Sequence, residues 1–183
     1  MINNKLSAFL NEGFGGLLTA VISDIKQHIV SLRESGVSFY GYAAMPPDYA
    51  TEFDPTSFAV AFNCESDIDE ENKKKPYYRY SVDEWQNYVH DGFEATNAEL
   101  KSILSEFKTL TKQQDDDGAV EYLAPSINKT LLNALMSLRN DGTFEGIAYV
   151  VIWISDSSDE IINQSAKSLN SAEVYDEYAS EFC

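Results

Sequence analysis

The sequence predicts a single α+β domain over residues 1–183, with a small, mostly antiparallel sheet packed by several amphipathic helices. Two observations support this fold class. Several segments repeat apolar residues at the three-to-four-residue spacing of a helix, and four shorter segments are rich in aromatic and β-branched residues. No stretch rich in Gly, Ser or Pro divides the chain, and its length of 183 residues suits one domain.

The first third predicts one long helix followed by two strands. Apolar residues from Leu17 to Leu32 follow the helical period, and Gly36 is a suitable residue to end that helix. Residues 37–45 and 57–64 have the composition of strands. Because the connection between them is short, we expect an antiparallel hairpin.

The middle third is the most highly charged part of the chain. Residues 65–71 hold five acids and are soon followed by three lysines, which predicts an exposed loop or turn. Residues 77–80 predict a short strand, and the S-x-x-E pattern at 81–84 predicts a capping box that starts a helix. Residues 93–110 predict an amphipathic helix, and the acidic residues at 115–118 predict a solvated turn after it.

The last third predicts a buried strand between helices. Residues 127–138 form an amphipathic helical pattern, and residues 147–154 are almost continuously apolar, as in a central strand buried on both faces. Helical patterns return at 160–169 and at 172–182, the second with Ser171 as its N-cap.

Charge excludes two classes of partner. The chain has 13 Lys and Arg against 30 Asp and Glu, a net charge of −17, so it would repel nucleic acid and anionic membranes. Residues 1–60 carry a net charge of −3, whereas residues 61–120 and 121–183 carry −7 each. Because 44% of the residues are hydrophobic and 13% aromatic, acidity here does not indicate disorder.

The chain shows no signal for secretion and no pattern for a metal, a cofactor or catalysis. No basic stretch followed by an apolar run opens the sequence, so we expect a cytoplasmic protein with Cys64 and Cys183 as free thiols. The longest apolar run, 147–154, is too short to span a bilayer. His28 and His90 are the only histidines, and neither an HExxH nor a CxxC motif is present.

Residues 78–85, Tyr-Arg-Tyr-Ser-Val-Asp-Glu-Trp, resemble a signature of the bacterial domain-of-unknown-function family 4303. Similar segments follow the family's order at 39–42, 61–65, 142–144 and 165–170, so the resemblance covers most of the chain. It supports the fold and brings no catalytic residues with it. Small acidic bacterial families of this kind resemble immunity proteins encoded beside polymorphic toxins.

The first functional hypothesis is an immunity protein that neutralises a basic toxin domain. A strongly negative protein associates rapidly with a basic partner, and nuclease toxins are basic because they hold nucleic acid. Acids on loops and helix ends would occupy the toxin's cleft, with tyrosines as anchors. For any single acid the alternative is ordinary solvated surface. The candidate partner-binding residues are Asp67, Asp69, Glu70, Glu71, Tyr77, Tyr78, Asp156, Asp159 and Glu160.

The second hypothesis is an enzyme or small-ligand-binding module of unknown substrate, with a cleft beside the sheet. Its candidate residues come from the two most family-like segments and can form hydrogen bonds: Arg79, Trp85, Ser165, Lys167 and Asn170. A deep pocket that joins Arg79 to Lys167 would favour this hypothesis. A convex acidic face without such a pocket would favour the first.

Overall fold

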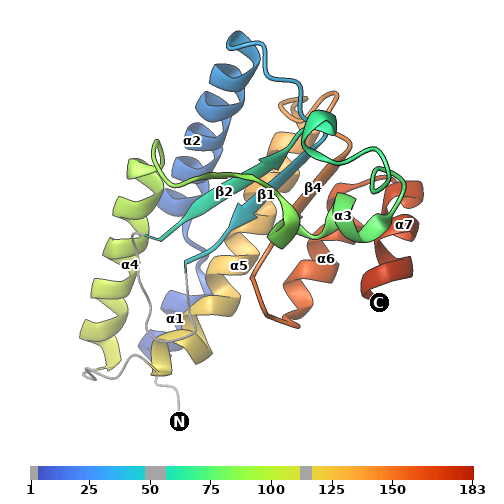
Figure 1. Cartoon of the computed structure of the whole chain (residues 1–183). Coiled ribbons are helices and arrows are strands. Elements are labelled where there is room, and N and C mark those ends of the chain that lie inside the picture. Colours follow the sequence, from blue (N-terminus) through green and yellow to red (C-terminus); the bar gives the residue numbers. More distant parts are fainter. Residues whose placement is uncertain (1–3, 48–56, 112–116) are drawn as a thin grey trace.

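The computed structural model describes residues 4–47, 57–111 and 117–183, and it confirms the α+β fold. A four-stranded sheet lies at the centre, with helices on both sides (Figure 1). The strands are β1 (Gly41–Met45), β2 (Ala59–Asn63), β3 (Asn87–Val89) and β4 (Tyr149–Ile152), in the spatial order β3-β2-β1-β4. The short strand β3 was not predicted from the sequence.

The sheet is mixed rather than mostly antiparallel. β1 and β2 form the predicted antiparallel hairpin, and β3 continues it antiparallel to β2. β4 pairs with β1 in parallel, because the long helical crossover between β3 and β4 brings the chain back in the direction of β3, which is also the direction of β1. The prediction of a mostly antiparallel sheet was therefore wrong at β4.

β4 is buried along its whole length, as predicted, but it is an edge strand and not a central one. Its outer edge is covered by α6 (Glu160–Leu169), which packs closely against it. A strand covered in this way is as apolar as a central strand, so its composition does not reveal its position in the sheet.

Apolar helices cover the face of the sheet that carries Tyr42 and Phe62. α2 (Gly15–Glu34) packs on α4 (Glu94–Thr111) and α5 (Asp117–Asn140), and α1 (Asn4–Asn11) lies against α4 and α5 (Figure 1). α2 ends at Glu34, and the predicted stop residue Gly36 follows its C-cap with a φ of +75°, next to a bond from the Val37 amide to the Leu32 carbonyl.

Short segments and α7 (Ala172–Phe182) lie on the other face, on the right in Figure 1. The predicted strand at 77–80 is wrong, because this segment is the helix α3 (Pro76–Tyr80). Pro76 at the first helical position favours that conformation. The predicted capping box does not form: 81–84 contains only one turn of 3-10 helix, η2 (Val82–Glu84), without a side-chain cap.

By length and composition, the stretch Asn4–Glu34 could cross a membrane, a test that core helices and signal sequences also pass. Here the stretch is broken into α1 and α2, and one apolar face of α2, with Leu17, Val21, Ile25 and Ile29, is buried where α2 packs on α4 and α5. The acidic turn predicted at 115–118 lies outside the described residues except for Asp117 and Gly118, which begin α5.

Candidate functional site

Trp85 anchors the 78–85 segment on the sheet. Gly41 leaves a gap in β1 between Asn63 and Tyr149, which occupy the same register on the neighbouring strands. The Trp85 indole fills this gap so closely that a Cβ at Gly41 would lie 2.8 Å from its ring. The close approach therefore requires glycine at position 41.

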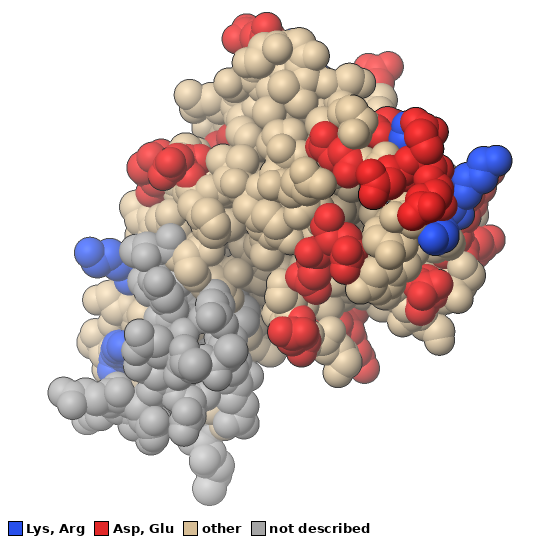
Figure 2. Space-filling model, viewed as in Figure 1, with Lys and Arg blue, Asp and Glu red and all other residues tan. Residues whose placement is uncertain are grey.

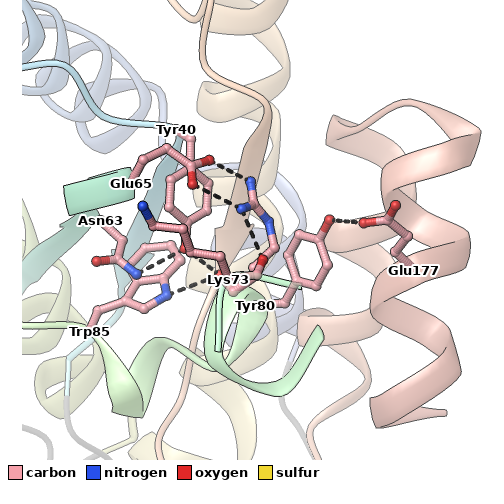
Figure 3. Close-up of polar contacts among 8 residues, drawn as sticks. Tyr40, Asn63, Glu65, Lys73, Tyr80, Trp85 and Glu177 are labelled. Carbon is pink, nitrogen blue, oxygen red and sulfur yellow. Dashed lines mark hydrogen bonds and ion pairs between the residues drawn. The ribbon is translucent and has the colours of Figure 1, made fainter. Parts of the chain in front are cut away.

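The Arg79 carbonyl oxygen is the polar centre of this anchor (Figure 3). It accepts hydrogen bonds from Trp85 Nε1, at 3.2 Å, and from the Tyr40 hydroxyl, at 2.9 Å. Asn63 Nδ2 in turn donates to the Tyr40 hydroxyl at 2.9 Å. The backbone of α3 is thus fixed by directional bonds from Tyr40, just before β1, and from Trp85, just after η2, while Asn63 of β2 holds the Tyr40 hydroxyl in place.

The Arg79 side chain points the other way, toward Glu65. Its two terminal nitrogens lie 2.8 and 3.1 Å from the two carboxylate oxygens of Glu65, and its guanidinium carbon lies 4.4 Å from the centre of the Tyr40 ring. The hydrogen bonds from Arg79 hold the pKa of Glu65 below its usual value. Stacking and bidentate pairing together orient the guanidinium.

Arg79 forms part of the wall of a cleft of about 520 Å³ between α3 and α7. On the α7 side, Glu177 accepts a 2.5 Å hydrogen bond from the Tyr80 hydroxyl. Burial and this bond raise the pKa of Tyr80 to about 12, so Tyr80 is not a base at neutral pH. The cleft is lined by Lys73, Lys74, Pro76, Arg79, Tyr80, Ala148, Glu173, Val174 and Glu177.

Ser165 and Asn170 belong to a different part of the molecule, the outer edge of β4. The Asn170 amide bonds both the N–H and the C=O of Val150 at 2.8 Å, and Ser165 Oγ accepts from the Ile152 amide at 2.9 Å. These side chains take the place of a fifth strand and close the edge.

The structure thus separates the five residues of the predicted ligand cleft. Arg79 belongs to α3 and its carbonyl contacts Trp85, whereas Ser165, Lys167 and Asn170 come from α6 and its C-cap. The Lys167 ammonium lies 5.8 Å from the centre of the Tyr175 ring and is not among the residues that line the Arg79 cleft.

Some of the predicted partner-binding acids have structural contacts. Asp67 accepts from Asn87 Nδ2 at 2.8 Å and so ties the turn η1 (Glu65–Asp67) to β3. Asp159 caps α6 by accepting from the Ile161 amide at 2.9 Å. Glu70 pairs with Lys73. Asp69, Glu71, Asp156 and Glu160 are exposed, and no salt bridge is found for them within the described part of the chain.

Asp83 brings the two predicted acidic groups to one side of the molecule. It accepts hydrogen bonds from Trp153 Nε1 at 3.0 Å and from Ser155 Oγ at 2.6 Å, which holds the loop after β4 beside η2. α7, which packs on α3, adds further acids. Figure 2 shows red patches over this side. We call this set the acidic surface: Asp69, Glu70, Glu71, Asp83, Glu84, Asp156, Asp159, Glu160, Glu173, Asp176, Glu177 and Glu181.

Sequence reasoning missed the contribution of α7 to the acidic surface. Glu173, Glu177 and Glu181 are spaced four residues apart, a spacing that puts them on one face of a helix. Because α7 was predicted with correct bounds, this spacing could have identified the third acidic group.

Tyr77 is an exposed aromatic residue within the acidic surface. Its ring is 41% exposed and stacks on Phe182 with the ring centres 6.4 Å apart, and its hydroxyl donates to Glu84 at 2.9 Å. Tyr78 packs edge-on against Tyr77 and is half-buried. Of the two predicted anchors, Tyr77 is the more accessible.

The chain matches a known protein family over most of its length. Residues 17–171 match the family described as "Domain of unknown function (DUF4303)". The chain belongs to the DUF4303 family. This confirms the resemblance seen at residues 78–85. No match was found among curated proteins or among solved structures.

In this DUF4303 chain, two of the family-like segments have structural roles. Residues 78–85 dock α3 on the sheet, and residues 165–170 close the edge of β4. The thiol of Cys64 is held in its protonated form, since burial and the neighbouring Asp67 raise its pKa to about 11. Within the described ranges, no three His, Cys, Asp or Glu side chains are grouped so that they could hold a metal ion.

Proposed function

We propose that this DUF4303 protein is a cytoplasmic immunity protein that binds and neutralises a basic nuclease toxin domain and catalyses no reaction of its own. The observation that supports the proposal is the excess of unpaired carboxylates on the acidic surface. Of the acids on that surface, Glu70 alone forms a salt bridge within the described residues; the second nearby pair, Arg79 with Glu65, lies beside it.

Unpaired like charges on one surface repel one another, and a cationic partner relieves that repulsion. Their field also increases the rate at which a basic protein is captured, by steering it toward the surface. Tyr77 adds an accessible aromatic ring among the acids, the kind of residue that often anchors an interface. A nuclease suits this surface because its active-site cleft is built to bind phosphates.

The proposal predicts a toxin gene beside the gene for this chain, and co-expression of the two genes tests it. We expect the chain to restore growth to cells that express the toxin, and we expect the two purified proteins to form a complex that weakens as salt increases. Absence of both protection and complex would contradict the proposal.

Two triple variants separate the acidic surface from net charge. Glu71→Gln, Asp156→Asn and Glu160→Gln remove three charges from the acidic surface, whereas Glu12→Gln, Glu34→Gln and Glu106→Gln remove three from exposed positions on α2, on α4 and after α1. Since both sets change the net charge equally, we expect the first to lower toxin affinity about tenfold or more and the second less than about threefold. Equal losses would show that only net charge matters.

A small-ligand-binding module is the second candidate, and the cleft beside Arg79 favours it. Its volume of about 520 Å³ lies within the range of known ligand sites. Lysines and glutamates line it together, which suits a zwitterion such as an amino acid. A thermal-shift screen with amino acids tests this candidate. Stabilisation that is lost in Lys74→Ala and Glu173→Gln would support it, and no shift with any amino acid would exclude that ligand class.

A further inference from the structure

A second cleft, of about 330 Å³, lies between the middle of α5 and the N-terminal end of α6. Pro125, Leu132 and Ile161 give it apolar walls. Its polar lining residues are Asn128, Lys129, Asp159, Glu160 and Gln164. It shares no lining residue with the cleft beside Arg79.

Asn128 is the unusual residue in this cleft. It is only 2% exposed, and its Oδ1 has no hydrogen-bond donor among the residues that the structure describes. Buried acceptors in proteins are nearly always paired. Asn128 also interrupts an apolar pattern, since Ile127, Leu131 and Leu132 around it are buried. Packing alone would favour leucine here, and no contact among the described residues accounts for the Oδ1 acceptor.

A half-turn of the amide about χ2 exchanges Oδ1 with Nδ2. Asn128, a lining residue of the cleft, can therefore offer either its oxygen or its nitrogen to a group that enters. Asp159 and Glu160 add two carboxylates at the same cleft, and they outnumber the single cation, Lys129. A ligand that complements these groups therefore carries several N–H donors and a positive charge.

The apolar walls specify the rest of the ligand. Leu132 and Ile161 can cover a chain of methylene groups, as apolar surfaces do for the stems of long basic side chains. A lysine or an arginine combines such a stem with a cationic donor head, and the guanidinium of arginine supplies the larger number of donors.

We propose that the cleft between α5 and α6 receives a lysine or arginine side chain of the basic partner. The inference rests on the proposed function, because Asp159 and Glu160 belong to the acidic surface through which the partner would bind. In the complex, the cationic head contacts Asn128 and the two carboxylates, and the stem lies along Leu132 and Ile161.

The first test uses n-butylguanidinium as a probe of the arginine side chain, with uncharged n-butylurea for comparison. We expect saturable shifts of the Asn128 side-chain amide in NMR spectra, with a dissociation constant on the order of 1–10 mM for so small a ligand. n-Butylurea should bind at least about fivefold more weakly. No saturation with n-butylguanidinium, or equal affinity for the two probes, would overturn the inference.

Asn128→Leu removes the amide and keeps a similar volume. Because it replaces an unpaired buried polar group, we expect it to fold at least as stably as the wild type and to bind n-butylguanidinium at least about fivefold more weakly, as seen in the backbone amide shifts of α5. Asn133→Leu, at an exposed position of α5, is the control and should bind the probe normally. Unchanged affinity in Asn128→Leu would overturn the inference.

The second test uses the complex and keeps the two proposals distinct. We expect Asn128→Leu to weaken toxin binding about tenfold, as loss of a partner for a buried cation does, and Asn133→Leu to leave it unchanged. If the toxin binds wild type and Asn128→Leu equally, the cleft inference fails and the immunity function stands. If no toxin is neutralised, the proposed function fails, and the n-butylguanidinium titration still decides whether the cleft binds such a side chain.

Discussion

The two faces of the sheet are held to their helices in different ways. On the face toward α2 and α5, the side chains are mostly large and apolar, and His28 Nδ1 of α2 lies 2.9 Å from the Tyr42 hydroxyl of β1. On the face toward α3 and α7, Gly41 leaves a gap, and hydrogen bonds from Tyr40 and Trp85 hold the covering segment.

The difference shows how short segments can be fixed as firmly as long helices. α2 and α5 bury continuous apolar stripes, and burial needs no particular direction of contact. The segment 65–85 has only short turns with few backbone bonds of their own, so its position depends on directional bonds to side chains. This second face supports the acidic surface.

The largest expected effect on stability comes from Trp85, which holds the covering segment on the second face. Trp85→Ala should lower the free energy of unfolding by about 3–5 kcal/mol, because it leaves a cavity over Gly41 and removes a bond to the Arg79 carbonyl. Trp85→Phe keeps most of the packing but loses the N–H donor. The lost hydrogen bond should lower the free energy of unfolding by about 1 kcal/mol, in addition to any effect of changed packing. Urea unfolding measures both. A cost of Trp85→Ala below about 1 kcal/mol would show that this contact does not hold the face.

A somewhat smaller effect on stability is expected at the outer edge of β4, which Asn170 closes. Asn170→Leu should cost about 2–4 kcal/mol, since the N–H and C=O of Val150 lose their partner. Ser168→Ala, at an exposed position of α6, should stay within about 0.5 kcal/mol of the wild type in the same urea titration. If the two variants are equally stable, the edge of β4 does not need this amide.

The contact between His28 and Tyr42 on the first face should make the stability of the protein depend on pH. Burial lowers the pKa of His28 below 6.5, so the stability contributed by its neutral form is complete above pH 6.5 and is lost as the pH falls through the lower folded pKa. We expect a slope of up to about 1.4 kcal/mol per pH unit in that window.

Urea unfolding between pH 7.5 and 5.5 measures this slope. The slope should be absent in His28→Gln and retained in His90→Gln, which changes an exposed histidine. An identical slope in wild type and His28→Gln would assign the pH dependence to other groups.

The smallest effect is expected for the ion pair outside the second face. Glu65→Gln should lower stability by less than about 1 kcal/mol at low salt and less again in 0.5 M NaCl, because the Glu65 side chain is 54% exposed. Since the pKa of Glu65 is lowered, its contribution is present above its ordinary pKa and is lost as the pH falls through the lower folded value. Differential scanning calorimetry at the two salt concentrations gives the comparison, and a cost above about 2 kcal/mol would contradict it.

Prediction from the sequence succeeded where the pattern was local. α6 and α7 have the predicted bounds, and Ser171 caps α7 by accepting from the Val174 amide at 3.3 Å. It failed at residues 77–80, where aromatic residues in a row suit a strand as well as a helix and where the docking contacts come from Tyr40 and Trp85. The sequence also could not predict that Ser165 and Asn170 lie apart from Arg79, because their position depends on which edge of the sheet β4 occupies.

The sequence by itself determined the long helices, the hairpin and the acidic excess of residues 61–183, since periodicity, turn length and charge can be read within a short window. Only the tertiary structure decided that β4 pairs in parallel at the edge of the sheet. It also decided that Asp83 holds the loop after β4 beside η2, that α7 packs on α3, and that Oδ1 of Asn128 has no partner among the described residues. These features depend on contacts between residues far apart in the chain, which no local pattern specifies.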